Sequence, residues 1–268
     1  MSDQAAVSLR GVSKSFRAGV TALQGIDLDV RPQEFVSLIG PSGCGKSTLL
    51  RIIADLIAPT AGAVEVNGKS AHRARLDHDY GIVFQEPVLY DWRTVSKNIA
   101  LPLELLKWDR SRRNARAQEL LELVELESFA EHHPWQLSGG MQQRVSIARA
   151  LSFDPALLLM DEPFGALDEM TRERLNMELL RIWEASGSTI VFVTHSIPEA
   201  VFLSTRVVVM SPRPGQIAGI VEVDLPQPRD ARTREEPRFF ELVTEVRERL
   251  AARGADVAAE EQVAEEAM

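Results

Sequence analysis

Residues 40–48 read GPSGCGKST, and this stretch decides the fold. Its glycines let the backbone turn tightly and point successive N–H groups at phosphate oxygens, while Lys46 adds a positive charge and Ser47 a hydroxyl for Mg²⁺. The apolar run 35–39 before it predicts a buried strand, and apolar residues at helical spacing after it predict a helix whose N-terminus faces the phosphates. The sequence thus predicts a phosphate-binding loop. Its residues are Gly40, Pro41, Ser42, Gly43, Cys44, Gly45, Lys46, Ser47 and Thr48.

The composition bounds the class of protein. At 268 residues the chain is one large α/β domain or a domain with an appended subdomain, and its 45% hydrophobic content is ordinary for a soluble protein. No run approaches the ~18 consecutive apolar residues of a membrane span. The net charge of −9 argues against a general nucleic-acid binder. Because the N-terminus lacks signal-peptide features and Cys44 is the only cysteine, we expect a cytoplasmic protein without disulfides.

The loop residue Cys44 occupies a variable position and is interpreted as a filler, the alternative being a reactive thiol. Before the loop, apolar residues alternate at a period near two on both sides of Gly19 and Thr21, which predicts an antiparallel hairpin. Phe16 lies at the bend of this hairpin. Its ring is either a stacking face for an adenine base or a half-buried packing residue, and the hairpin alone does not decide between the two.

A strand predicted at 80–84 ends at Gln85, followed by EPVLYDWRTVSKNI, which is typical of an exposed functional loop. Gln85 is either a polar strand end or a ligand of a metal or water. Residues from about 95 to 131 are predicted to be mainly helical, with a basic run at 110–116 that is interpreted as a solvated face. His132 and His133 have no third ligand at metal spacing and are interpreted as loop residues.

Residues 136–144 read QLSGGMQQR and open a helical pattern. Ser138 with Gly139 and Gly140 at a helix start predicts a second anion site, although a plain helix N-cap explains the same residues.

Carboxylates follow the next buried strand, predicted at 157–160. Asp161 and Glu162 lie where parallel sheets bind ligands: Asp161 can hold Mg²⁺ through its water shell, and Glu162 can orient or deprotonate a water. His195 ends the strand predicted at 189–194; a lone histidine is usually structural, but this one falls at the same sheet edge.

Taken in order, GPSGCGKST, Gln85, LSGGMQQR, LLLMDEP, GALD and His195 resemble the ATP-binding subunit of ABC transporters over about residues 7–225. The resemblance implies a P-loop NTPase core with an antiparallel β subdomain and a helical insertion that carries the signature motif. The implied cofactors are ATP and Mg²⁺. For the nucleotide, the resemblance implies adenine stacking by Phe16, phosphate binding by Lys46 and Thr48, and metal binding by Ser47, Gln85 and Asp161. For hydrolysis, it implies a catalytic base in Glu162 and a γ-phosphate switch in His195. It also implies that Asp168 lies near a dimer seam and that the signature residues act on the nucleotide of the other subunit; these are Ser138, Gly139, Gly140 and Met141.

Three positions depart from the family pattern. Phe16 replaces the commoner tyrosine and keeps the stacking face. Met141 replaces the usual glutamine after LSGG, which puts a polar contact there in doubt. Ser196 replaces the frequent aspartate and receives no role. The segments VFQEPVLYDWRTVSKNI and THSIPEAVFLSTRVVVMSPRPGQI are similar to those of the nitrate, sulfonate and taurine importer group.

The resemblance implies an import ATPase: a homodimer on the cytoplasmic face of the inner membrane that drives multi-span permease subunits, with an extracytoplasmic solute-binding protein as an indirect partner. The alternative is a soluble ABC-type ATPase acting on nucleic acid or ribosomes, which would normally show two cassettes, a coiled-coil insertion or zinc cysteines. A nucleotide-binding module without turnover is disfavoured because Lys46, Asp161, Glu162 and His195 are all present. The expected domains are an ATP-binding domain at 1–225 with a helical subdomain at about 95–150, a short C-terminal helical segment at 226–250, and an acidic tail at 251–268, as disorder or a frayed helix.

Overall fold

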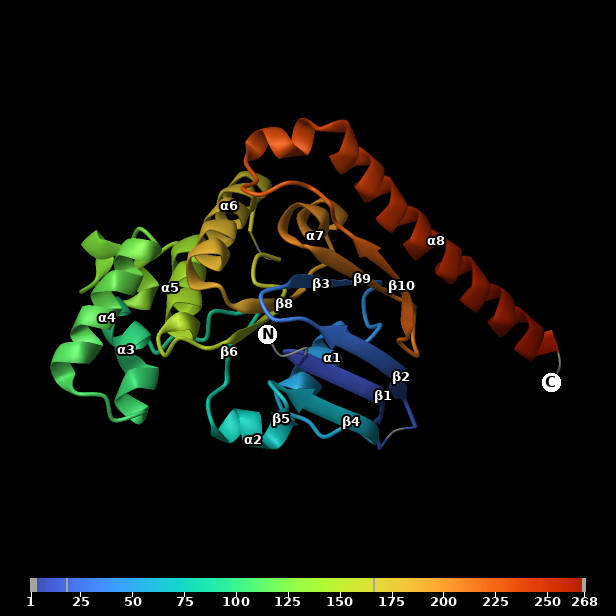
Figure 1. Ribbon diagram of the computed structural model, residues 1–268, viewed down its shortest axis with the longest axis horizontal. Helices are drawn as coiled ribbons and strands as arrows, with labels where there is room; N and C mark the ends of the chain where they lie inside the picture. Colours follow the sequence, from blue (N-terminus) through green and yellow to red (C-terminus); the bar gives the residue numbers. More distant parts are fainter. Residues whose placement is uncertain (1–3, 18, 166, 267–268) are drawn as a thin grey trace. The chain divides into compact units, whose positions relative to one another are not determined.

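The computed structural model describes residues 4–17, 19–165 and 167–266 (Figure 1). Side chains are described as far as Ala252. The chain divides into two compact units. The first unit contains the described residues up to Asp77 and from Thr189 onward, and the second unit is His78–Ser188. The domain boundaries expected from the sequence differ from this division and stay a prediction.

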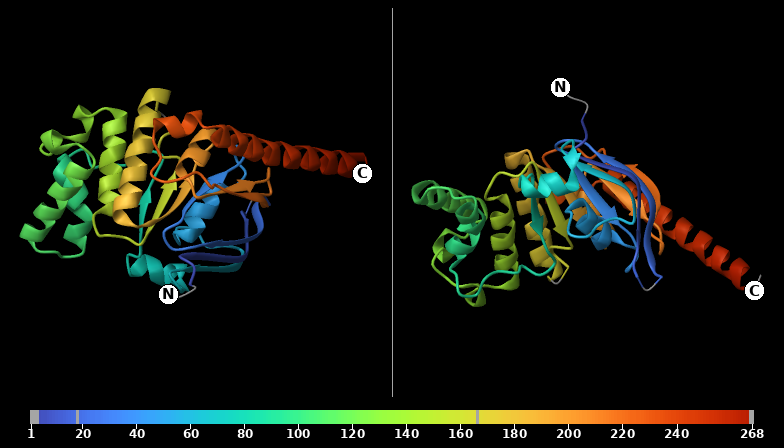
Figure 2. Two further views of the ribbon diagram at one scale, coloured as in Figure 1. Left: turned by 45° about the horizontal axis from the view of Figure 1, so that its top comes forward. Right: turned by 90° about the horizontal axis from the view of Figure 1, so that it is seen from below.

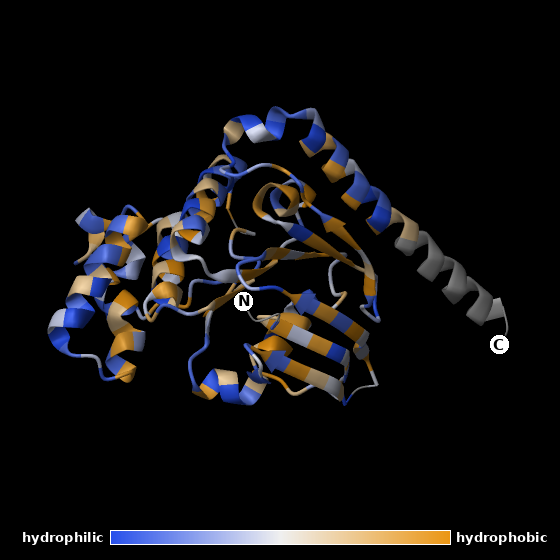
Figure 3. Ribbon diagram, viewed as in Figure 1, coloured by the Kyte–Doolittle hydropathy of each residue, from blue (hydrophilic) through white to orange (hydrophobic). Residues whose placement is uncertain are grey.

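An antiparallel sheet forms one part of the first unit. Its strands are, in spatial order, β2 (Thr21–Val30), β1 (Val7–Ser15), β4 (Ala61–Val66) and β5 (Lys69–Ser70). Val7 pairs with Val30 and Leu9 with Leu28, so apolar side chains share one face of the sheet. The alternating colours along β1 and β2 show this pattern (Figure 3). The predicted hairpin is therefore confirmed.

A second group of strands in the first unit runs in the order β10, β9, β3, β8. Their bounds are β3 (Phe35–Ile39), β8 (Thr189–Val193), β9 (Arg206–Met210) and β10 (Ile217–Glu222). β3 pairs in parallel with β8 and with β9, and all three are buried along their whole length. This explains why their sequences are continuous apolar runs, because parallel strands are covered on both faces.

Helices cover these strands within the first unit (Figure 2). α1 (Lys46–Ile53) contacts β2, β4 and β8, whereas α7 (Ile197–Leu203) contacts β3 and β9. The short helix α2 (Ala71–Leu76) packs on β4 and β5. The 3₁₀ turn η3 (Ala231–Glu235) leads into α8 (Pro237–Glu266), which packs on β9 and β10.

The C-terminal segment is tied to α7 by Arg229. Its buried guanidinium donates to the carbonyl oxygens of Phe202 at 2.7 Å and Ser204 at 2.9 Å, at the end of that helix. These carbonyls have no partner within the helix, so a basic side chain is a suitable cap. α8 then continues as far as Glu266, through most of the tail for which the sequence predicts disorder or a frayed helix; residues 267–268 lie outside the described residues.

The second unit joins two parallel strands to a helical region. Its strands are β6 (Tyr80–Val83) and β7 (Leu157–Asp161), and its helices are α3 (Val95–Leu105), α4 (Arg110–Leu123), α5 (Gly139–Leu151) and α6 (Glu169–Ser186). The 3₁₀ turns η1 (Glu127–Phe129) and η2 (Pro134–Gln136) connect α4 to α5. Leu120, Leu121, Val124 and Leu126 are buried and form the apolar side of this region.

The predicted fold class is confirmed: an α/β P-loop core, an antiparallel β subdomain and a helical insertion that carries the LSGG stretch at the start of α5. None of the described helices combines the length and the apolar content needed to cross a membrane.

Candidate functional site

The phosphate loop lies between β3 and α1 in the first unit, as predicted. Lys46 begins α1, and its ammonium donates to the carbonyl oxygens of Gly40 at 2.8 Å and Pro41 at 3.1 Å. Its side chain is 5% exposed, so the charge is held within the loop. The ammonium also lies 4.0 Å from the Cys44 sulfur. A buried positive charge beside these groups is well placed to attract an anion.

Two loop positions require glycine. Gly45 has a φ of 104°, and a Cβ there would lie 2.9 Å from the carbonyl oxygen of Ala22. A Cβ at Gly40 would lie 2.9 Å from the carbonyl oxygen of Met210. Cys44 is buried, which favours the filler interpretation over a reactive thiol. The backbone carbonyls of Ala22 and Met210 thus lie close to the outer side of the loop.

His195 lies at the same edge of the strands as the phosphate loop. Leu38 pairs with Val193, so residues 40 and 195 each follow the carboxyl end of a paired strand. On either side of the exposed His195, Thr194 donates to the carboxylate of Glu199, and Ser196 caps α7 by accepting from the amide of Glu199 at 3.4 Å. The backbone of His195 is thereby fixed; its role as a γ-phosphate switch stays a prediction.

Phe16 ends the pairing of β1 with β2. Its amide donates to the carbonyl oxygen of Val20 at 2.9 Å, and its ring is 44% exposed, with the Lys14 ammonium 5.3 Å from the ring centroid. A half-exposed ring is free to stack on a base, so adenine stacking stays a prediction.

The second unit brings Gln85 and Glu162 together. Val83 pairs with Met160, so Gln85 and Glu162 each lie two positions beyond this pair. A Cβ built at Gly165 would lie 3.6 Å from the Glu162 carboxylate and 3.8 Å from the Gln85 side-chain nitrogen. Both predicted residues thus face one small space at the carboxyl ends of β6 and β7, and Asp161 is the last residue of β7.

Glu162 also has an unusual backbone, with φ at 46°. Left-handed conformations are uncommon for residues other than glycine and often occur at functional sites. This conformation changes the direction of the backbone directly after β7.

The signature stretch opens α5. Ser138 is the N-cap, and its exposed hydroxyl accepts from the amide of Met141 at 3.3 Å. Ser138 is therefore a helix N-cap, as one of the two interpretations holds. The neighbouring amides of the helix N-terminus are also suited to an anion. Close packing also favours glycine at position 140, because a Cβ there would lie 3.1 Å from the Thr171 methyl group.

Asp168 lies beside this stretch as the N-cap of α6. The amide of Thr171 donates to its carboxylate at 3.0 Å and holds the pKa of that carboxyl below its usual value. Gly139 is near the same segment, since a Cβ there would lie 3.7 Å from Leu167. The second unit therefore brings together the signature residues and Asp168.

Sequence reasoning missed two side chains of α5 that hold the segment after β6. Gln143 donates to the carbonyl oxygen of Phe84 at 3.3 Å, and Arg149 donates to those of Pro87 at 3.0 Å and Val88 at 2.9 Å. Burial lowers the pKa of Arg149. Val88 has a φ of 47°, which is strained for a β-branched residue, and Arg149 supports that conformation. The sequence signal for Arg149 is a charged residue within the largely apolar stretch 145–151, whereas Gln143 lies in the polar run QQR and gives no such signal.

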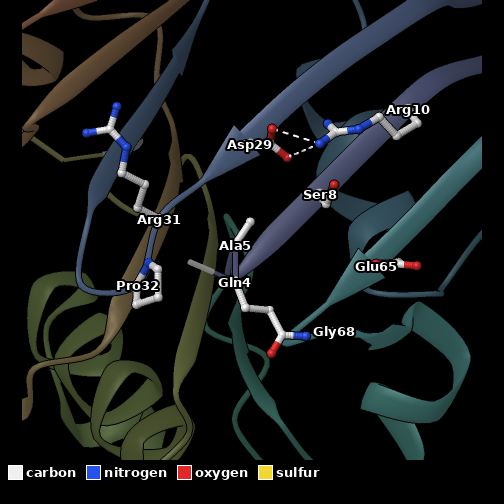
Figure 4. A pocket seen from close by; sticks show the side chains of 9 residues that line it. All are labelled: Gln4, Ala5, Ser8, Arg10, Asp29, Arg31, Pro32, Glu65 and Gly68. Carbon is white, nitrogen blue, oxygen red and sulfur yellow. Dashed lines mark hydrogen bonds and ion pairs between the residues drawn. The ribbon is translucent and has the colours of Figure 1, made fainter. Parts of the chain in front are cut away.

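A separate surface depression of about 460 Å³ lies on the antiparallel sheet of the first unit (Figure 4). Its lining includes Arg10 and Asp29, whose guanidinium and carboxylate form an exposed ion pair at 2.8 Å. The residues that line it include none of the predicted site residues. The pair is satisfied within the sheet and contributes no chemistry to the predicted site.

Comparison with known proteins identifies the family to which the chain belongs. The model of the ABC transporter family matches residues 23–165. A taurine import ATP-binding protein of Rhizobium johnstonii is 45% identical over 85% of this chain and 88% of the relative. An aliphatic sulfonates import ATP-binding protein of Bacillus cereus is 46% identical over 83% of this chain and 88% of the relative. A solved dimeric ATP-binding cassette bound to ADP and Pi superimposes with a TM-score of 0.71 at 38% identity, over 81% of this chain and 98% of that one.

The chain therefore belongs to the ABC transporter family. It is an ATP-hydrolysing subunit of the importer group that the sequence resembles, so the predicted family and ATPase activity are confirmed.

Proposed function

We propose that this subunit works as a homodimer that couples ATP hydrolysis to the uptake of a small solute, such as taurine, a sulfonate or nitrate, through partner permease subunits. The observation that carries the proposal is the pair of sites in the second unit: Gln85 with Glu162 after the strands, and Ser138 with Asp168 at the helix starts. A soluble ATPase acting on nucleic acid or ribosomes is not favoured, because the similar proteins are import subunits.

The residues present suit Mg²⁺ together with a nucleotide. The Ser47 hydroxyl, the Gln85 amide and the Asp161 carboxylate are hard oxygen donors, which Mg²⁺ prefers. Within the described ranges no cluster of three or more His, Cys, Asp or Glu side chains is placed to hold a metal ion. That suits an ion held mainly by phosphates and water, with few protein ligands. When bound, it neutralises phosphate charge.

The chain's own side chains then divide the remaining work. The loop amides and Lys46 hold phosphates, and the exposed ring of Phe16 stacks on adenine. The Glu162 carboxylate accepts the proton of the attacking water, and His195 contacts the γ-phosphate. Ser138, Gly139, Gly140 and Met141 complete the site on the partner subunit, with Asp168 near the seam; the dimeric state of the similar solved cassette supports this assignment.

The permease contact is proposed for residues 87–93 and the helical region that follows. Trp92 is 75% exposed, and its ring lies 4.8 Å from that of Tyr90. The buried Asn98 fixes this loop by accepting from the amide of Tyr90 at 2.8 Å and donating to its carbonyl oxygen at 3.1 Å. An exposed aromatic pair on a fixed loop is typical of a protein contact. In this role the subunit lies on the cytoplasmic face of the inner membrane.

We expect Trp92→Ala to reduce solute uptake by about tenfold or more while the ATPase of the isolated subunit stays near normal, because the exposed ring is proposed to contact the permease and not the nucleotide. Uptake in reconstituted vesicles and ATPase in detergent-free solution measure the two activities. Trp92→Phe keeps a large aromatic ring and serves as the control. If both activities fall together, or the alanine variant unfolds at a lower temperature, the ring packs within the subunit instead.

The function itself is tested by uptake of labelled taurine, an alkanesulfonate and nitrate in cells that carry or lack this subunit. Loss of uptake of one of them on deletion, restored by the intact chain and not by Lys46→Ala, supports the proposal. Unchanged uptake of all three solutes, with the ATPase stimulated by RNA or ribosomes, would establish the alternative. The solute-binding protein, which takes part indirectly, is expected to determine which solute is carried.

A further inference from the structure

The turn between β9 and β10, residues 211–216, lies beside the phosphate loop, and we call it the loop brace. Ile39 of β3 pairs in parallel with Val209 of β9, so the phosphate loop and the brace leave their strands at the same edge. The sequence of this turn, SPRPGQ, belongs to a segment that the nucleotide site does not otherwise use.

Two residues of the brace contact the outer side of the phosphate loop. The Arg213 guanidinium donates to the carbonyl oxygen of Gly43 through Nε at 3.3 Å and Nη2 at 3.1 Å. Gly215 approaches the next carbonyl so closely that a Cβ there would lie 2.0 Å from the oxygen of Cys44. Two successive loop carbonyls therefore face the brace.

The brace is itself fixed in place. The buried Ser211 hydroxyl accepts from the amide of Gln216 at 2.9 Å and lies 3.0 Å from the carbonyl oxygen of Pro212. The amide of Gly215 donates to Ala22 at 2.9 Å, and its carbonyl accepts from the amide of Gln24 at 3.0 Å, which ties the turn to β2. A turn held at both ends provides a rigid support.

The direction of the carbonyls determines the direction of the amides. Across a trans peptide the C=O and the following N–H point in opposite directions. With the carbonyls of Gly43 and Cys44 turned to the brace, the amides of Cys44 and Gly45 point to the inner side of the loop, where the Cys44 amide donates to the carbonyl oxygen of Pro41 at 3.3 Å. Amides directed before binding lower the cost of ordering the loop around phosphates.

We propose that the loop brace positions the phosphate loop for nucleotide binding, with Arg213 as a positioning residue that does not itself contact the nucleotide. The inference rests on the binding of phosphates by residues 40–48 proposed above. It adds to that function a support that lies outside the loop in sequence.

The first test replaces Arg213 in the full chain and measures the Kd of Mg–ATP and Mg–ADP, together with kcat and KM for ATP. Arg213→Ala is expected to weaken ATP and ADP by the same factor of about three to ten, because the supported amides serve phosphates common to both nucleotides. kcat should stay within about twofold. Arg213→Lys, which keeps a cationic donor, should recover part of the affinity. Arg31→Ala removes another exposed arginine of the same unit and should change neither Kd.

The second test replaces Gly215. Gly215→Ala places a methyl group against the Cys44 carbonyl and should raise both Kd values more than Arg213→Ala does. Gly219→Ala is the matched control, because the nearest atom to its Cβ, at 2.9 Å, is the flexible end of the Arg249 side chain. The melting temperature without nucleotide separates loop positioning from unfolding; if it falls for Gly215→Ala, the Arg213 series decides.

Several results would overturn the inference. Unchanged Kd values in Arg213→Ala would show that the brace does not position the loop. Weaker ATP binding with unchanged ADP binding would show that Arg213 contacts the γ-phosphate directly. If the unaltered chain and Arg31→Ala also failed to bind ATP, the proposed function of residues 40–48 would fail, which is distinct from a loss confined to the Arg213 and Gly215 variants.

Discussion

Glu162→Gln is expected to leave ATP binding intact and to lower turnover by about 10²- to 10⁴-fold, the usual cost of losing a general base. The amide is nearly isosteric with the carboxylate but cannot accept the proton of the attacking water. The space that Glu162 shares with Gln85 beside Gly165 is therefore kept while the chemistry is removed. Steady-state ATPase and equilibrium ATP binding measure the two effects.

The same variant should accumulate as an ATP-bound dimer, because hydrolysis is the step that is blocked. Light scattering or gel filtration with ATP detects the dimer. Glu184→Gln, at an exposed position on α6 of the same unit, is the control and should behave like the parent protein. Turnover of Glu162→Gln within about threefold of the parent would remove Glu162 as the base.

Mixing two inactive variants should restore nucleotide trapping if the signature acts in trans. Lys46→Ala removes the positive charge proposed to bind phosphate, and Ser138→Arg would fill the space proposed to lie beside the γ-phosphate, so each homodimer should be inactive. In a mixed dimer with two-fold symmetry, one site carries both substitutions and the other is intact. Equal mixing with free exchange then leaves roughly a quarter of all sites intact.

Trapping of labelled nucleotide is the measurement of choice, because two cooperating sites complicate steady turnover. Differential tags confirm that mixed dimers form. In a cis arrangement every site of a mixed dimer carries one substitution, so no trapping above that of either variant alone would assign Ser138 solely to capping α5. Each variant mixed with itself is the matched control.

The sequence predicts a large part of this fold because its strongest signals are local. The strand–loop–helix around Lys46, the hairpin at β1 and β2, and the continuous apolar runs of β7 and β8 each depend on neighbouring residues. α6 carries a weaker pattern and was not predicted, although Asp168 is a good N-cap residue. α2 and β5 are too short to give a periodic signal.

The candidate site residues that follow strands were accessible to prediction because parallel strands align their carboxyl ends. Hydrogen bonds from distant elements that hold the loops of the site could not be predicted in this way. Arg149 holds carbonyls about sixty positions earlier in the chain, and Arg213 holds a carbonyl about 170 positions away. Neither contact leaves a periodic or spaced pattern, since a single donor at a single position suffices to make it.

Helix α5 carries one of the proposed contact regions near each of its ends. Its N-terminus is the Ser138 cap, and its last turns carry Arg149, about 16 Å further along at 1.5 Å per residue. If residues 87–93 receive the permease and the start of α5 receives the partner's nucleotide, this helix connects the two contacts, because Arg149 donates to the carbonyl oxygens of Pro87 and Val88. Coupling of this kind is reciprocal. A permease contact at residues 87–93 that changed the free energy of nucleotide binding at the start of α5 would itself be changed by that binding by the same amount, so the helix would transmit the effect in both directions.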